Sequence, residues 1–178
     1  MSGQLPREFR TQRLLLRPFR TGDAGHVYAY ASDPEWAQYL PDMPNPYRHA
    51  DAADFVAERL QDAWAKQAVF AMVLHDRVVG AIDFRIAETN WANLGYSLAR
   101  EHWGKGLVAE AARPLITAAF QIGLARIEIS TALPNHRSWR IAEKLGFTYE
   151  GTLRSRMQVR EQRYDAVYYG LLPDEWKG

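Results

Sequence analysis

A glycine-rich turn near the middle of the chain has the composition of an anion-binding loop. Gly104 and Gly106 flank Lys105, and an apolar helical pattern begins at Leu107. Because glycine has no Cβ, the backbone can bend sharply there, and the first turn of the following helix leaves N–H donors without partners. These donors, the positive end of the helix dipole and the Lys105 ammonium would bind a pyrophosphate. A GxG sequence alone more often marks a structural turn, so the rest of the chain must decide between the two.

The composition is that of one globular domain. The chain has 178 residues, 47% of them hydrophobic, which suits a single domain over residues 1–178. Its 22 Lys and Arg nearly balance 21 Asp and Glu, so no overall field favours nucleic acid or a membrane. There is no cysteine, and the five histidines form no HxH or HxxxH pair, so we expect no metal site. The polar N-terminus and the absence of a long apolar run predict a cytoplasmic protein.

Hydrophobic periodicity predicts an α+β domain around one sheet. Strands are expected over residues 14–19, 69–74, 78–86, 91–98, 126–132, 149–156 and 166–172, and helices over 21–32, 49–66, 107–122 and 135–145. Gly123 and Gly146 stand where helix-ending glycines belong. The charged residues 157–165 predict a loop between the last two strands. Residues 34–46, rich in proline and aromatics, either cover the core or form one wall of a substrate cleft.

A second motif follows the glycine turn: Asn135-His136-Arg137-Ser138, and then Glu143-Lys144-Leu145-Gly146-Phe147. Residues 98–111 resemble the acetyl-CoA pyrophosphate loop of the GNAT superfamily of N-acetyltransferases, whose pattern is Q/R-x-x-G-x-G/A. The second motif is similar to the N-x-x-S signature of the RimJ/RimL-type branch. Residues 11–17 and 165–172 are also similar to that branch, so the resemblance covers essentially the whole chain.

The resemblance implies a fold and an activity. The fold is a mixed, mostly antiparallel sheet of about seven strands flanked by about four helices on both faces, with an acetyl-CoA cleft at the splayed centre. The activity is direct transfer of acetyl from acetyl-CoA, without a metal, to a primary amine, either a protein or peptide N-terminus of the ribosomal-protein type or a small molecule. A homodimer is one assembly that the resemblance allows.

Other functions remain open on the sequence. A succinyl or other short acyl donor would need an arginine nearby, and the sequence does not place Arg85, Arg100 or Arg154. A non-catalytic acyl-CoA-binding module would keep the glycine loop and need no catalytic side chain. A nucleotide-binding module is disfavoured because the chain lacks GxxxxGK[ST].

The resemblance also implies which residues hold acetyl-CoA. The strand expected over residues 91–98 ends with Tyr96, Ser97 and Leu98. Their backbone groups would bind the pantetheine amides as an added strand does, and one N–H group would stabilise the oxyanion. The pyrophosphate would lie on Trp103, Gly104, Lys105, Gly106, Leu107 and Val108.

Two residues of the second motif complete the expected site. Asn135 would bind pantetheine or cap its helix, and Ser138, one turn later, would also contact the cofactor. Ser138 is our candidate catalytic residue, donating a hydrogen bond to the leaving sulfur. A thiol with a pKa of about 8.5 leaves readily as thiolate, so this donor would contribute only ~2 kcal/mol.

Three positions depart from the superfamily pattern. Trp103 stands where Gln or Arg is usual, and Val108 where Gly or Ala is usual. The first change leaves the backbone donors intact, whereas the second could narrow the approach to the diphosphate. The tyrosine that many members carry seven residues after the motif Asn is Ala142 here, so that position supplies no general acid.

The sequence does not single out a general base. Asp83, Glu88 and Glu150 are candidates, and a water relay is an equal alternative. An α-amine with a pKa of about 8 costs ~1.4 kcal/mol to deprotonate at pH 7, against ~4.6 kcal/mol for a lysine amine. An enzyme without a dedicated base therefore acetylates an N-terminal amine more easily.

Overall fold

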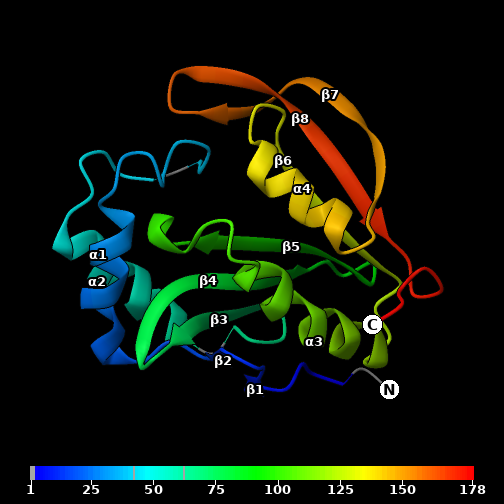
Figure 1. Cartoon of the computed structure of the whole chain (residues 1–178), viewed down its shortest axis with the longest axis horizontal. Helices are drawn as coiled ribbons and strands as arrows, with labels where there is room; N and C mark the ends of the chain where they lie inside the picture. The colour runs from blue at the N-terminus through cyan, green and yellow to red at the C-terminus, as the bar shows by residue number, and fades with distance from the viewer. Residues whose placement is uncertain (1–2, 42, 62) are drawn as a thin grey trace.

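One sheet of eight strands organises the computed structural model, which describes residues 3–41, 43–61 and 63–178 (Figure 1). Its order is β1-β2-β3-β4-β5-β6-β8-β7, with β1 (Phe9–Arg10), β2 (Leu15–Arg17), β3 (Gln67–Leu74), β4 (Arg77–Ile86), β5 (Trp91–Leu98), β6 (Arg126–Ala132), β7 (Thr148–Val159) and β8 (Gln162–Leu171). Among the described residues only β5 and β6 pair in parallel. The expected α+β architecture is confirmed, with β1 as an additional short edge strand.

Helices cover both faces of the sheet. They are α1 (Ala24–Ala31), α2 (His49–Arg59), α3 (Leu107–Gln121) and α4 (His136–Lys144), with short 3-10 turns η1 (Thr21–Asp23) and η2 (Arg100–His102). Successive strand residues point to opposite faces, so Phe70 packs in the core under α3 and α4, whereas Ala71 packs in a second core under α1 and α2. None of the described helices is long and apolar enough to cross a bilayer.

The two halves of the sheet separate between β5 and β6. The parallel pairing covers Trp91 to Asn93 on β5 and Arg126 to Glu128 on β6. Beyond it, β5 continues beside β4 to Leu98, while β6 continues beside β8. The end of β5 therefore has no strand on its β6 side among the described residues, which is the splayed centre expected from the resemblance.

The helix expected over residues 49–66 is wrong in its second half, because α2 ends at Arg59. Trp64 is only 8% exposed, and its indole Nε1 donates to the Leu5 carbonyl at 2.9 Å. Its ring also packs edge-on against Phe70, with 4.8 Å between centroids. Burying Trp64 requires the chain to leave the helix, and neither glycine nor proline marks that point.

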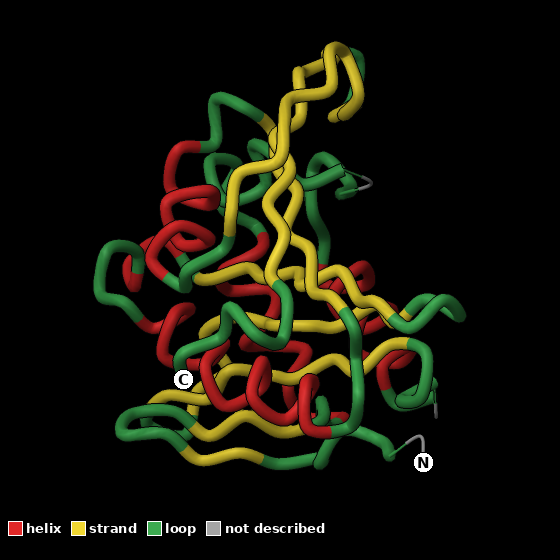
Figure 2. Tube along the Cα trace, turned by 90° about the vertical axis from the view of Figure 1, so that its right-hand side faces the viewer, coloured by secondary structure: helices red, strands yellow, loops and turns green. Residues whose placement is uncertain are grey.

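The loop expected over residues 157–165 is also wrong, because β7 and β8 form a hairpin that rises above the body of the protein (Figure 2). The pairing continues to Val159 opposite Gln162, so Arg160 and Glu161 alone connect the strands. Most residues near this tip are exposed, so they need no alternation of apolar and polar residues. Without that alternation, the sequence pattern did not indicate a strand.

Candidate active site

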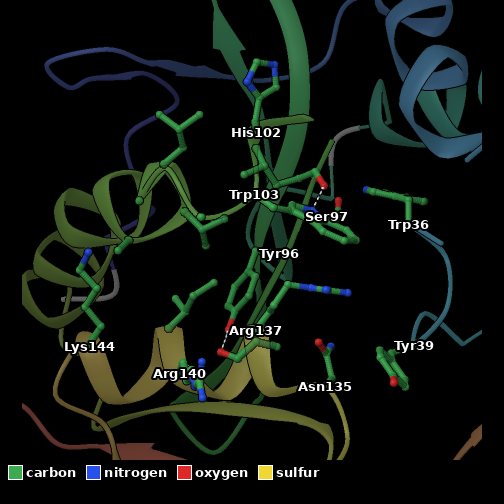
Figure 3. Close-up of a pocket in the computed structure, with 18 of the residues that line it drawn as sticks. Trp36, Tyr39, Tyr96, Ser97, His102, Trp103, Asn135, Arg137, Arg140 and Lys144 are labelled. Carbon is green, nitrogen blue, oxygen red and sulfur yellow. Dashed lines mark hydrogen bonds between the residues drawn. The ribbon is translucent and has the colours of Figure 1, made fainter. Parts of the chain in front are cut away.

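A pocket of about 380 Å³ opens where β5 and β6 diverge (Figure 3). Four segments line it: residues 35–40, the end of β5, the loop leading into α3, and α4. Of the cofactor-binding residues predicted from the sequence, all but Lys105 line this pocket, namely Tyr96, Ser97, Leu98, Trp103, Gly104, Gly106, Leu107, Val108, Asn135 and Ser138.

The glycine loop has the conformation that its composition indicated. Gly104 and Gly106 have φ values of 74° and 76°, in the left-handed region that favours glycine, and α3 begins directly afterwards. A Cβ built on Gly106 would lie 3.7 Å from the Lys144 ammonium and 3.9 Å from an Arg13 nitrogen. Cations and the N-terminus of α3 therefore converge on Gly106, an arrangement that attracts phosphate.

A network of hydrogen bonds braces this loop. Arg13 Nε donates to the Glu110 carboxylate at 2.7 Å, and Arg13 Nη1 donates to the Lys105 carbonyl at 3.1 Å. Thr11 Oγ1 also donates to Glu110, at 2.6 Å. Burial would raise the pKa of Glu110, but the bonds from Thr11 and Arg13 outweigh it and hold the pKa below its usual value. The side chain of Lys105 is exposed outside the pocket lining, and Lys144 supplies the ammonium near Gly106 instead.

The register of β5 on β4 decides which backbone groups face the cleft. The Ala99 amide donates to the Val79 carbonyl at 2.7 Å, and Leu98 lies opposite Gly80. Leu98 and Gly80 therefore form a non-hydrogen-bonded pair of the antiparallel ladder. Leu98 and Tyr96 therefore turn their N–H and C=O groups away from β4, toward the cleft. The backbone of Ser97 faces β4, so the side chain is what Ser97 offers to the pocket.

Trp103 connects the two walls of the pocket. Its indole Nε1 donates to the Leu98 carbonyl at 2.7 Å, and the guanidinium carbon of Arg137 lies 3.9 Å from its ring centroid (Figure 3). The tryptophan therefore keeps a polar donor but uses it to fix the end of β5. Val108, the other departure near the loop, is 5% exposed and belongs to the core, so most of its side chain lies inside.

Two hydroxyl groups meet beside α4. Tyr96 Oη donates to the Ser138 carbonyl at 2.8 Å and lies 3.0 Å from Ser138 Oγ. The phenol has a single proton, so the Ser138 hydroxyl donates in the second contact. Burial raises the pKa of Tyr96, which keeps the phenol protonated at neutral pH. Ala142 is fully buried in the core, so this helix position offers no hydroxyl to the pocket.

Asn135 adds an amide to the same region. It directly precedes α4, but its side chain makes no capping bond. Its Nδ2 donates instead to Thr131 Oγ1 at 3.0 Å. The Asn135 carbonyl oxygen accepts from the Ser138 amide at 3.0 Å, which fixes the first turn of the helix.

Several pocket residues were not identified from the sequence. Arg137, Arg140 and Lys144 lie at i, i+3 and i+7 of α4 and line the pocket, so helical spacing could have identified them. Trp36 and Tyr39 belong to the segment whose role the sequence left open; they line the opposite side, so residues 35–40 form one wall of the cleft.

None of the three candidate bases lines the pocket. Asp83 pairs with Arg85 at 3.1 Å, Glu150 pairs with Arg126, and Glu88 is exposed in a turn. Bonds from Arg126 hold the pKa of Glu150 below its usual value. None of the three is therefore placed to take a proton from an amine in the cleft.

Among the described lining residues, one carboxylate remains, that of Glu35. Its Oε2 accepts from Arg100 Nη1 at 3.0 Å, and its side chain is 69% exposed. His102 also lines the pocket, and its buried Nδ1 has no partner among the described residues. The pocket therefore holds cations and hydroxyls but no buried carboxylate that the structure describes.

Comparisons with known proteins agree with this geometry. Residues 13–148 match the model of the acetyltransferase (GNAT) domain family. The uncharacterized N-acetyltransferase p20 of Bacillus licheniformis is 31% identical over 173 residues, covering 94% of this chain and 97% of that protein. The ribosomal-protein-serine acetyltransferase of Escherichia coli (strain K12) is 32% identical over 117 residues, 64% of each chain. The crystal structure of a GNAT-family acetyltransferase from Bacillus anthracis superimposes with a TM-score of 0.83 at 27% identity, covering 94% of this chain and 99% of that one.

Proposed function

The chain belongs to the GNAT family of acetyltransferases, and we propose that it transfers acetyl from acetyl-CoA to the α-amine of a protein or peptide N-terminus. One observation carries the proposal: the pocket at the sheet opening combines the cation-rich glycine loop, the backbone groups that β5 turns toward the cleft and the Ser138 hydroxyl. These are the groups that a CoA thioester requires at its phosphate, amide and sulfur positions.

The residues present fit acetyl-CoA. The diphosphate would lie against the N-terminus of α3 at Gly104 and Gly106, with Lys144 beside it. The pantetheine amides would pair with the N–H and C=O groups of Tyr96 and with the N–H group of Leu98, whose carbonyl already accepts from Trp103. One of these N–H groups would stabilise the oxyanion of the tetrahedral intermediate.

Ser138 would donate a hydrogen bond to the leaving sulfur. Its hydroxyl can turn from Tyr96 Oη, 3.0 Å away, toward the cleft. Tyr96 itself is a poor proton donor, because burial raises its pKa far above that of a thiol. The tyrosine would instead hold Ser138 in place, and the proton on sulfur would come from the attacking amine.

The choice of acceptor rests on the titratable groups of the pocket, where His102 and the exposed Glu35 are the described candidates for a base. The described lining residues offer no buried carboxylate to remove a proton, which favours an amine of low pKa over a lysine side chain. Trp36 and Tyr39 would form the wall against which the first acceptor residue packs. The related ribosomal-protein-serine acetyltransferase supports an N-terminal acceptor of the ribosomal type.

Binding of the donor is tested by thermal denaturation. Acetyl-CoA at 100 times its Kd is expected to stabilise the protein by ~2.7 kcal/mol, which raises the Tm of a chain of this size by about 5–10 °C. Free acetate at the same concentration should leave Tm unchanged. If CoA compounds cause no shift, the proposed cofactor site is wrong.

Acceptor and donor choice are tested by thiol release. A peptide with a free α-amine should react faster at pH 7 than its Nα-acetylated, lysine-containing counterpart, with a panel of small amines measured in parallel. Equal rates for the two peptides would contradict the argument from amine pKa. A preference for succinyl-CoA over acetyl-CoA would indicate that Arg137, which lines the pocket, binds the carboxylate of the succinyl group.

Replacing Ser138 with alanine is expected to lower kcat about 30-fold, equivalent to ~2 kcal/mol, because the thiolate loses a hydrogen-bond donor but remains a fair leaving group. The Tm shift caused by acetyl-CoA should be retained. Ser32→Ala, an exposed serine at the end of α1, is the matched control and should leave kcat unchanged. Wild-type kcat in Ser138→Ala would remove this hydroxyl from the reaction.

A further inference from the structure

The β7–β8 hairpin carries a cluster of arginines, which we call the hairpin arginines: Arg154, Arg156, Arg160 and Arg163. All four are exposed, and Glu161 is the one acidic residue among positions 154–163. None makes an ion pair within the described part of the chain. The four arginines outnumber the carboxylates beside them, Glu161 and Asp165, so the cluster keeps a net positive charge that an anionic partner would stabilise.

The part of the hairpin that carries Arg154 and Arg156 is a structured bulge. Leu153 pairs with Ala166 and Met157 with Tyr164, so residues 154–156 lie opposite one residue of β8. Ser155 at the centre has a φ of 53°, and its amide donates to Asp165 Oδ1 at 2.8 Å.

A second bond fixes the bulge from the other side. Arg163 Nη1 donates to the Ser155 carbonyl at 3.0 Å. Side chains of β8 therefore hold both backbone groups of Ser155. Bulges that are held in this way commonly reorient side chains next to active sites.

The hairpin lies beside the acceptor wall of the pocket. The ring of Tyr164 on β8 contacts Tyr39 edge-on, with 5.7 Å between centroids, and Tyr39 lines the pocket. In Figure 1 the hairpin reaches over toward the segment that carries Tyr39. A polypeptide whose N-terminus enters the pocket beside Tyr39 would therefore pass the hairpin on its way out.

We propose that the hairpin arginines bind acidic residues of the acceptor polypeptide a few positions after the acetylated amine. This inference rests on the proposed function, because it assigns the continuation of an N-terminal acceptor. Nucleic acid is less well matched, because the net charge of the whole chain is only +1. Charge complementarity at the mouth of the cleft therefore favours an acidic peptide.

The experiment compares two dye-labelled peptides with the same first residue and free α-amine. One carries Asp and Glu at positions 3–8, and the other has Asn and Gln there. Binding is measured by fluorescence anisotropy and acetylation by thiol release, both with wild-type protein and with Arg154→Gln/Arg156→Gln. Arg10→Gln/Arg77→Gln, which removes the same charge from exposed sites on other strands, is the control.

We expect wild-type protein to bind the acidic peptide about 10-fold more tightly than the neutral one, with a correspondingly lower KM. The hairpin variant should lose this preference, while its kcat and acetyl-CoA Tm shift stay unchanged, and the control should retain it. Raising the ionic strength should weaken the preference, because the charges are exposed.

Equal binding of both peptides by wild-type protein would overturn the proposal, as would a preference that survives in the hairpin variant. Competition by single-stranded RNA, without any effect of peptide charge, would assign the arginines to nucleic acid and also overturn it. The anisotropy readout separates this inference from the proposed function. Preferential binding of the acidic peptide without its acetylation would support the docking surface and contradict the proposed N-terminal acetyltransferase activity.

Discussion

Gly106→Trp is expected to abolish the Tm shift caused by acetyl-CoA and to reduce acetyl transfer at least 100-fold. A side chain at this position would project toward the Lys144 ammonium and Arg13, 3.7 and 3.9 Å from its Cβ, and would fill the space for the diphosphate. The φ of 76° adds strain of about 1–2 kcal/mol for any L-residue. Thermal denaturation with and without acetyl-CoA, together with thiol release, measures both effects.

Strain and obstruction can be separated with two further variants. Gly123→Trp places the same side chain at a φ of 96° with nothing within 4 Å of the Cβ, outside the pocket. It should lower Tm but keep the acetyl-CoA shift. Gly106→Ala should lose less binding than Gly106→Trp, because a methyl group fills less of the site. A full shift in Gly106→Trp would show that the donor binds elsewhere.

Asp23→Ala is expected to reduce the free energy of unfolding by about 3–5 kcal/mol, because it leaves a buried cation without its partner. Arg17 on β2 donates to both Asp23 oxygens, at 2.7 and 2.9 Å, and the two side chains are 8% and 6% exposed. The Arg20 amide also donates to Asp23, at 2.7 Å. Denaturant unfolding followed by circular dichroism measures the loss.

A double replacement tests whether the buried charge causes the loss. Arg17→Met/Asp23→Leu removes both charges and should cost less than Asp23→Ala alone. A double variant that is less stable than Asp23→Ala would show that packing, not the isolated charge, dominates.

The pH dependence of stability gives an independent check on this pair. Burial would raise the pKa of Asp23, but the bonds from Arg17 and Arg20 outweigh it and lower the pKa. The carboxylate therefore contributes stability above its unfolded pKa of about 3.9, and this contribution is lost as pH falls through the lower folded pKa. The stability difference between wild type and Asp23→Ala should be largest near neutral pH and shrink below about pH 4. A difference that grows on acidification would contradict the sign of this linkage.

Elements with a local cause could be predicted from the sequence. β5 and β6 have the expected bounds, and Gly104, Gly106, Gly123 and Gly146 all adopt the positive φ that their positions indicated. Backbone sterics and hydrophobic period act over a few residues, so a short stretch of sequence records them. The same holds for the two motifs whose family the comparisons confirm.

Elements that depend on distant packing could not be predicted. α2 ends at Arg59 because Trp64 is drawn into the core beside Phe70 and Leu5, contacts that lie outside the helix. The tip of the β7–β8 hairpin forms from exposed, charged residues because its two strands pair with each other, Met157 with Tyr164 and Val159 with Gln162. At α2 a distant partner outweighs the local pattern, whereas the hairpin tip pairs through its backbone and needs no apolar pattern.

The sequence by itself determined that this protein has a glycine loop before a helix and the two signatures of an acetyltransferase. The tertiary structure alone decided how the pocket is equipped: Arg137 over Trp103, Tyr96 against Ser138, and Lys144 beside Gly106. Tyr96 and Ser138 are 42 positions apart, and they meet because α4 packs where the sheet opens between β5 and β6. The side-chain identities were visible in the sequence, but such distances depend on how helices pack on a divided sheet, which no local pattern records.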